Sequence, residues 1–210
     1  VGASTTLTAN GGTGFTYLWS NGATTQAITV SPSATTTYTV SVTNAGGCTS
    51  ASVASQVITV NPLPVATITA SASAVCVGTS ATLTASAGSS YLWSTGATTA
   101  AITVTPTSTT SYFVTVTNAN GCSATSAVTT IGVNPLPVVA AGNDATICAG
   151  SSTSLVASGA ATYVWSPSTG LSATNTASVT ANPSATTTYT VTGTDANGCV
   201  NTDQVVVTVS

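Results

Sequence analysis

The sequence predicts an all-β chain of three tandem β-sandwich domains arranged as a rod. Two observations carry this prediction. Apolar residues recur with a period of two along short segments, as they do on one face of a strand, and no helical spacing of apolar residues persists. In addition, one sequence pattern occurs three times, and its unit has the size of a small β domain.

The repeated unit consists of motifs that keep the same order in every copy. Each copy opens with a stretch like VGTSATLTA, found at 1–9, 77–85 and 149–157. A Tyr-x-Trp-Ser motif follows, then a proline, a Thr-rich Tyr-x-Val segment and a Gly-Cys pair. Because these motifs recur together, we interpret the whole chain as three versions of one domain.

Two prolines mark each boundary between copies. Asn-Pro-Leu-Pro stands at 61–64 and again at 134–137, and proline both stops strand pairing and stiffens a linker. The predicted domains are therefore 1–61, 65–134 and 138–210. The first copy opens at its second expected strand, so we expect it to lack strand A and to leave one sheet edge unpaired.

The middle copy shows the expected strand order most clearly. Tyr112, Val114 and Val116 alternate with Phe113 and Thr115, so the two sets lie on opposite faces of one strand. Short strands separated by turns are typical of two antiparallel sheets packed face to face. The expected strands A, B, C, E, F and G lie at 65–72, 80–86, 90–94, 100–105, 111–118 and 124–133.

The motif string resembles a known class of repeat. Its parts are C-x-G-x-(S/T)-x-x-L-x-A, then Y-x-W-S, then T-T-x-Y-x-V-x-V-T-x-x-x-G-C. This string is similar to the Ig-like and PKD-like tandem repeats of Bacteroidetes cell-surface proteins of the gliding and adhesion type, over essentially the whole chain. The resemblance implies immunoglobulin-like (PKD-like) β-sandwich domains and an extracellular or cell-surface location.

The Tyr-x-Trp pairs are candidates for a core or for a binding surface. Both side chains of a pair point to the same side of strand C. We interpret them as core residues, because the pair recurs at the same place in all three copies, and an aromatic platform that stacks on sugars is the alternative. The six residues are Tyr17, Trp19, Tyr91, Trp93, Tyr163 and Trp165.

Five cysteines in a Ser- and Thr-rich chain with few charges indicate disulfides formed in an oxidising compartment. Two pairing patterns remain open. Within a copy, Cys76 would pair with Cys122 and Cys148 with Cys199. Between copies, Cys76 would pair with Cys199, because the two ends of one sandwich lie too far apart while neighbouring copies stack end to end. Cys48 then has its partner outside the chain.

The composition excludes most kinds of catalysis. The chain has no Lys, Arg, His or Glu, so a nucleophile would have no strong base beside it and phosphate would have no cation to bind. We expect neither an enzyme nor a nucleic-acid-binding protein, and no cofactor. The acidic residues are Asp144, Asp195 and Asp203. Asp195 and Asp203 flank the last F–G turn and are the calcium candidate, although solvated turn residues are the preferred interpretation.

The low charge indicates self-association. Lysine and other charges normally protect sheet edges, and a net charge of −3 over 210 residues gives little repulsion. We therefore predict a structural repeat segment of an extracellular fibre, sheath or surface stalk, whose partners are copies of itself or neighbouring repeats of the same protein. The alternative is an adhesin whose repeats bind glycans or partner cells. No apolar run approaches the ~20 residues of a membrane span.

Overall fold

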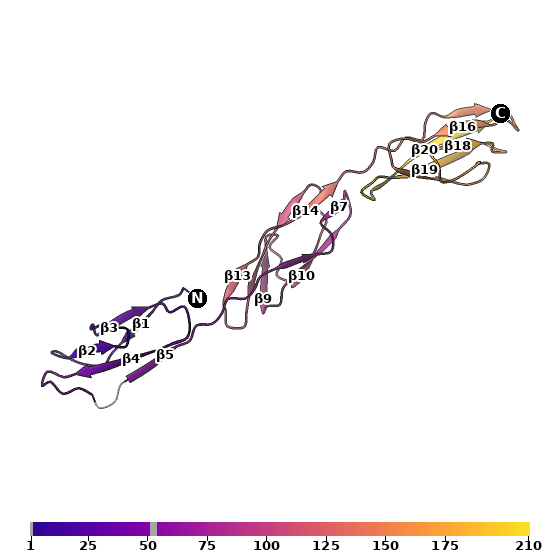
Figure 1. Cartoon of the computed structure of the whole chain (residues 1–210). Coiled ribbons are helices and arrows are strands. Elements are labelled where there is room, and N and C mark those ends of the chain that lie inside the picture. The colour runs from indigo at the N-terminus through magenta and orange to yellow at the C-terminus, as the bar shows by residue number, and fades with distance from the viewer. Residues whose placement is uncertain (1, 51–53) are drawn as a thin grey trace.

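The protein is an extended row of three groups of β-strands (Figure 1). The computed structural model describes residues 2–50 and 54–210. These residues form strands joined by turns and loops, and among them no helix is long and apolar enough to cross a membrane. The three groups follow the three sequence repeats along the chain, which confirms the predicted all-β architecture of tandem sandwiches.

The first repeat places a sheet of β1 and β3 against a sheet of β2, β4 and β5. β1 pairs with β3, while β4 pairs with both β2 and β5, and all of these pairs are antiparallel. Among the described residues β3 is the one partner of β1. The strands are β1 (Thr5–Thr8), β2 (Thr16–Trp19), β3 (Ala27–Val30), β4 (Thr36–Thr43) and β5 (Ala54–Ile58).

The second repeat has a leading segment, residues 65–76, that crosses from one sheet to the other. Within it β6 pairs antiparallel with β8, beside β10, and β7 pairs parallel with β14 in the opposite sheet. β14 also pairs with β11, and β12 pairs with β9 and β13. The strands are β6 (Ile68–Ala70), β7 (Ala74–Cys76), β8 (Ala81–Ala85), β9 (Ser90–Trp93), β10 (Ala101–Val104), β11 (Thr110–Tyr112), β12 (Val114–Thr117), β13 (Ser123–Thr125) and β14 (Thr129–Asn134).

The third repeat has the same plan with longer F and G strands. One sheet runs in the order β15, β20, β19, β17, with β15 parallel to β20, and the other pairs β16 with β18. An isolated bridge from Ala140 to Ser158 ties the leading segment, residues 138–148, to the second sheet. The strands are β15 (Ala145–Ile147), β16 (Thr153–Val156), β17 (Thr162–Ser166), β18 (Ser178–Ala181), β19 (Thr187–Thr194) and β20 (Val200–Val209).

Three strands expected to be continuous in the second repeat are shortened or interrupted, and serine hydroxyls accept backbone amides at these places. The expected strand A at 65–72 is shortened to β6. Beyond it Ser71 Oγ accepts the amide of Thr82 at 2.9 Å, and the chain continues in the other sheet as β7. The expected strands F and G are each broken into two. At that break the Val114 amide donates to Ser126 Oγ instead of to a ladder carbonyl.

Each repeat has its own core around the tryptophan of strand C. Trp93 and Trp165 are each 2% exposed and Trp19 is 5% exposed. The three clusters of buried residues share no member. Each indole N–H donates to a carbonyl of the loop that follows strand C, so the one polar group of each buried ring has a hydrogen-bond partner. The acceptors are the carbonyls of Thr25, Thr99 and Thr176.

The tyrosine of each pair makes contacts inside its own repeat. Tyr17 is buried, and Tyr91 and Tyr163 are half-buried. The Tyr91 hydroxyl donates to the carbonyl of Gly88 and accepts its amide, and Tyr163 does the same with Ala160. The six aromatic side chains therefore hold strand C to the sandwich.

Truncating the buried ring should destabilise the second repeat. We expect Trp93→Ala to lower its free energy of unfolding by about 3–5 kcal/mol, because a large cavity replaces the indole. The matched control is Leu92→Ala, since Leu92 is 54% exposed and its loss should change stability by less than about 0.5 kcal/mol. Hydrogen exchange of peptides from the second repeat measures both. A Trp93→Ala protein that folds normally but loses binding to glycans would contradict the core assignment.

Candidate functional site at the joins between repeats

The join between the second and third repeats contains a disulfide. Cys76 is the last residue of β7, and Cys199 follows the F–G turn of the third repeat. The two sulfur atoms are bonded, and the Cα atoms lie 5.5 Å apart although 123 positions separate the residues in sequence. Of the two pairing patterns open from the sequence, the structure contains the between-copy bond.

Sandwich geometry explains why this bond crosses the join. Cys76 lies level with Asn134, the last residue of β14, whereas Cys122 precedes β13 at the opposite end of the same repeat. Strands of about eight residues are about 26 Å long, and a disulfide requires Cα atoms within about 7 Å. The within-copy bonds Cys76–Cys122 and Cys148–Cys199 are accordingly absent, and Cys122 and Cys148 are free.

Asparagine side chains anchor both proline-rich linkers to the repeat that follows. Asn118 Nδ2 donates to the carbonyl of Pro62 at 2.9 Å, and Asn201 Nδ2 donates to the carbonyl of Pro137 at 3.0 Å. Proline already limits the backbone of these linkers, and the hydrogen bonds fix the direction in which they leave. The sequence did not predict that these two asparagines hold the linkers. The one feature that could have indicated it is their position beside an F–G turn.

The join between the first and second repeats contains a half-buried free cysteine. Cys122 has in the second repeat the place that Cys199 has in the third. Its Sγ lies 3.9 Å from the carbonyl oxygen of Asn61, and it lines a pocket of about 290 Å³ together with Gly2 and Val60.

The other two free cysteines lie outside these joins. Cys48 follows the F–G turn of the first repeat, and Cys148 follows β15 of the third repeat. Both side chains are exposed. They therefore lie at the two outer ends of the row.

One side-chain oxygen caps each F–G turn. In every repeat it accepts two backbone amides, the second of which belongs to the Gly-Cys cysteine, at 2.8 to 3.0 Å. The capping residues are Asn44, Asn118 and Asp195. Asp195 thus does in the third repeat what asparagine does in the first two, and this role positions the cysteine without a metal ion.

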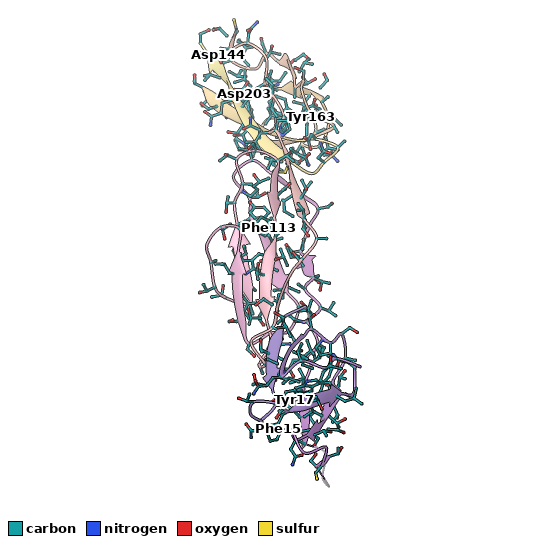
Figure 2. All side chains as sticks on the ribbon, turned by 90° about the vertical axis from the view of Figure 1, so that its left-hand side faces the viewer. Phe15, Tyr17, Phe113, Asp144, Tyr163 and Asp203 are labelled. Atoms are coloured by element: carbon teal, nitrogen blue, oxygen red, sulfur yellow. A yellow bond between two sulfur atoms is a disulfide. The ribbon has the colours of Figure 1, made fainter. Side chains whose placement is uncertain are left out.

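The two aspartates proposed as a calcium pair are not brought together. Asp203 lies opposite Val191 on β19, whereas Asp195 lies beyond the end of that strand, about 13 Å further along. Asp203 Oδ2 accepts the amide of Ala141, and Asp144 Oδ1 accepts the amide of Val206, each at 2.8 Å. Figure 2 places Asp144 and Asp203 on the third repeat. Within residues 2–50 and 54–210 no three metal-ligating side chains form a group.

Comparisons with known proteins find similarity in fold alone. The chain matches no protein-family model and no curated protein. A structure of a 1.5-MDa bacterial ice-binding adhesin is 16% identical, with a TM-score of 0.41 and coverage of 100% of this chain and 92% of that one. Extracellular domains 3–5 of Drosophila OTK are 12% identical, with a TM-score of 0.36 and the same two coverages. Fibronectin(III)-like modules of Clostridium thermocellum CbhA are 11% identical, with a TM-score of 0.36 and coverage of 69% and 94%.

Acid should weaken the third repeat through Asp203. The amides of Ala141 and then Gln204 hold the pKa of Asp203 below its ordinary value, and desolvation opposes this only in part. A carboxylate with a lowered pKa stabilises the fold above its unfolded-state pKa of about 3.9, and this stabilisation is lost as the pH falls through the folded-state pKa. We therefore expect Asp203→Asn to lose less thermal stability than the wild type between neutral pH and pH ~2.

The loss of stability is measured as the loss of hydrogen-exchange protection in β20 between neutral pH and pH ~2, in the wild type and in Asp203→Asn. Asp144 and Asp195 are present in both proteins, so their contributions to the acid response are common to both. An identical loss of protection in the wild type and in Asp203→Asn would show that the hydrogen bond to Ala141 does not stabilise the third repeat.

Proposed function

We propose that this chain is a structural repeat segment of an extracellular fibre, sheath or surface stalk. The observation that carries the proposal is the join between the second and third repeats, where a disulfide links the two neighbouring repeats covalently. A binding module needs an exposed site for its ligand, whereas a stalk needs joins that keep its repeats aligned. Two anchored proline linkers and an interrepeat disulfide meet the second need.

Free cysteines at the outer ends support a longer assembly. Cys48 and Cys148 are exposed at positions that match the two partners of the Cys76–Cys199 bond. Identical joins on both sides would continue the row with the same geometry. A head-to-tail contact of this kind forms an open filament when its rotation does not close a ring.

The outer face of strand C offers a lateral contact. Strand C is an edge strand in every repeat, as β2, β9 and β17, and its central residue is apolar and more than half exposed. These residues are Leu18, Leu92 and Val164, at 58%, 54% and 57% exposure. Phe113, which lies on the middle repeat, is also 42% exposed (Figure 2). An uncharged edge with apolar side chains favours pairing with another chain.

Three further proposals concern catalysis, domain bounds and location. We infer a non-catalytic protein, because the chain has no residue that could serve as a strong general base. We propose that each repeat folds as a domain, with bounds 1–61, 65–134 and 138–210, since each has its own buried cluster. A disulfide and the resemblance to Bacteroidetes-type surface repeats support an extracellular or cell-surface location.

Self-assembly should depend on the outer face of strand C. We expect the chain to form filaments at high concentration, and we expect Leu18→Asp, Leu92→Asp and Val164→Asp together to prevent this, because they replace the exposed apolar side chains of strand C with charge. Sedimentation velocity and electron microscopy measure the outcome. The matched control places the same charge on the other sheet, at the exposed residues Thr29, Thr103 and Thr180, and should assemble more readily.

Two results would count against the structural role. A wild-type chain that stays monomeric at high concentration would contradict self-assembly. Isolated flexible stalks that bind glycans or partner cells would instead favour the adhesin alternative.

A further inference from the structure

The disulfide between the repeats closes a long loop of chain. Cys76 and Cys199 are separated by 123 positions in sequence, yet their Cα atoms lie 5.5 Å apart. Residues 77–198, called the bridged loop below, therefore leave and return at one place, the join between the second and third repeats. Residues 65–76 lead into this place and residues 200–210 lead out of it. A pull on these two segments is passed on by the disulfide and not by the bridged loop.

The segment before the bridged loop runs along the whole second repeat. β7 is parallel to β14, so it ends at the side where β14 stops and the linker to the third repeat begins. β6 has the same direction, because it is antiparallel to β8, and β8 starts just after the turn that follows Cys76. At the other end the carbonyl of Pro62 accepts Asn118 Nδ2 at 2.9 Å, and the carbonyl of Val65 accepts the Ser86 hydroxyl at 2.6 Å. The segment therefore crosses the repeat once, from join to join.

The segment after the bridged loop runs along the whole third repeat. β20 begins at Val200, directly after Cys199, and its 10 residues end at Val209. At the outer end of this repeat the Ser210 amide donates to the carbonyl of Ile147 at 3.0 Å (Figure 1). At ~3.4 Å per residue this strand is about 34 Å long, which is close to the greatest length its backbone can reach. A pull along β20 can therefore lengthen it very little.

Both segments are held by the cores of their repeats. Val75 is 7% exposed, and Val205 and Val207 are 0% exposed. Cys199 is also 0% exposed, so its sulfur is closed to solvent. β20 lies between β15 and β19 in the middle of its sheet. Further apolar residues of the first segment pack against the core of the second repeat, namely Ala66, Ile68, Ala70 and Ala72. A pull along the two segments thus acts parallel to the strands beside them and does not peel them away.

We propose that residues 65–76, the Cys76–Cys199 bond and residues 200–210 form one tension-bearing thread through the second and third repeats. The thread keeps tension off the bridged loop, which contains the buried Trp93 and Trp165. Both repeats then stay folded while the chain is under tension. The inference deepens the proposed role as a stalk and rests on that role only for the origin of the tension.

The bridged loop contains a large length of chain that only a broken thread can release. Without the disulfide, tension passes through residues 77–198 in series, and the two repeats unfold one after the other. At up to ~3.6 Å per residue, the 123 positions add about 440 Å when they are pulled straight. We call this the hidden length. With the disulfide intact, the ends of the bridged loop are held together and the hidden length is not released.

Single-molecule stretching of the full chain tests the proposal. The handles are joined enzymatically to both ends of the chain, so that no cysteine is modified. In the oxidised protein we expect the unfolding step of the first repeat and no release of the hidden length. In the reduced protein we expect two further steps that together release it. The first repeat lies outside the bridged loop, so its step occurs in both states and identifies a single intact molecule.

The timing of the release shows whether the two repeats stay folded under tension. A dithiol reductant is added while the oxidised chain is held at constant force. It becomes a cyclic disulfide and leaves Cys76 and Cys199 as thiols. If the thread protected the repeats, they are still folded at that moment, and the hidden length appears later in separate unfolding steps. A single jump by the whole hidden length at the instant of reduction would show that the bridged loop had already unfolded, and would overturn the proposal.

Serine variants test the thread without a reductant. We expect Cys76→Ser to release the hidden length under oxidising conditions, and Cys199→Ser to do the same from the other side of the bond. The matched control is Cys148→Ser, which removes an exposed free thiol and should behave as the wild type. Hydrogen exchange of β12 and β19 without force verifies that each variant is folded before it is stretched. The same released length in the wild type and in both thread variants would contradict the proposal.

The result separates this inference from the structural role. If the oxidised wild type releases the hidden length while the chain still forms filaments, the thread is refuted and the structural role stands. If the hidden length is released only after reduction while the chain forms no filaments, the thread stands and self-assembly does not.

Discussion

The disulfide between Cys76 and Cys199 is the interaction on which the extended arrangement depends. The second and third repeats each place one cysteine at the end of the leading segment and one behind the F–G turn, and these positions lie at opposite ends of the sandwich. Because a strand of this length exceeds the reach of a disulfide several times over, the two cysteines of one repeat cannot meet. They can meet only across a join, so the covalent chemistry that stabilises the protein also aligns its repeats.

The leading segment couples the interior of a repeat to its join. In the second repeat the same residues, 65–76, cover the seam between the sheets and deliver Cys76 to the third repeat. Packing and linkage are therefore not separate properties of this fold, since a strand that completes one core also positions the cysteine for the next bond.

Much of this could be predicted from the sequence, because the threefold motif and the period-two pattern report directly on strands, repeats and the buried tryptophans. The crossing of the leading segment from β6 to β7 could not, since the point near Ser71 at which the chain changes sheets has no marker in the period-two pattern. The disulfide pattern stayed open because it depends on how neighbouring repeats are placed. Asp195 and Asp203 are close in sequence, but the register of β19 and β20 separates them along the strands.

Mapping of disulfides in the native protein is the most direct test of the bond between the second and third repeats. The chain has no Lys or Arg, so trypsin cannot cut it, and pepsin or chymotrypsin is used under non-reducing conditions. We expect a fragment in which Cys76 is linked to Cys199 within one chain, with Cys122 not linked to Cys76. Recovery of Cys76–Cys122 or Cys148–Cys199 fragments in place of this one would contradict the between-repeat join.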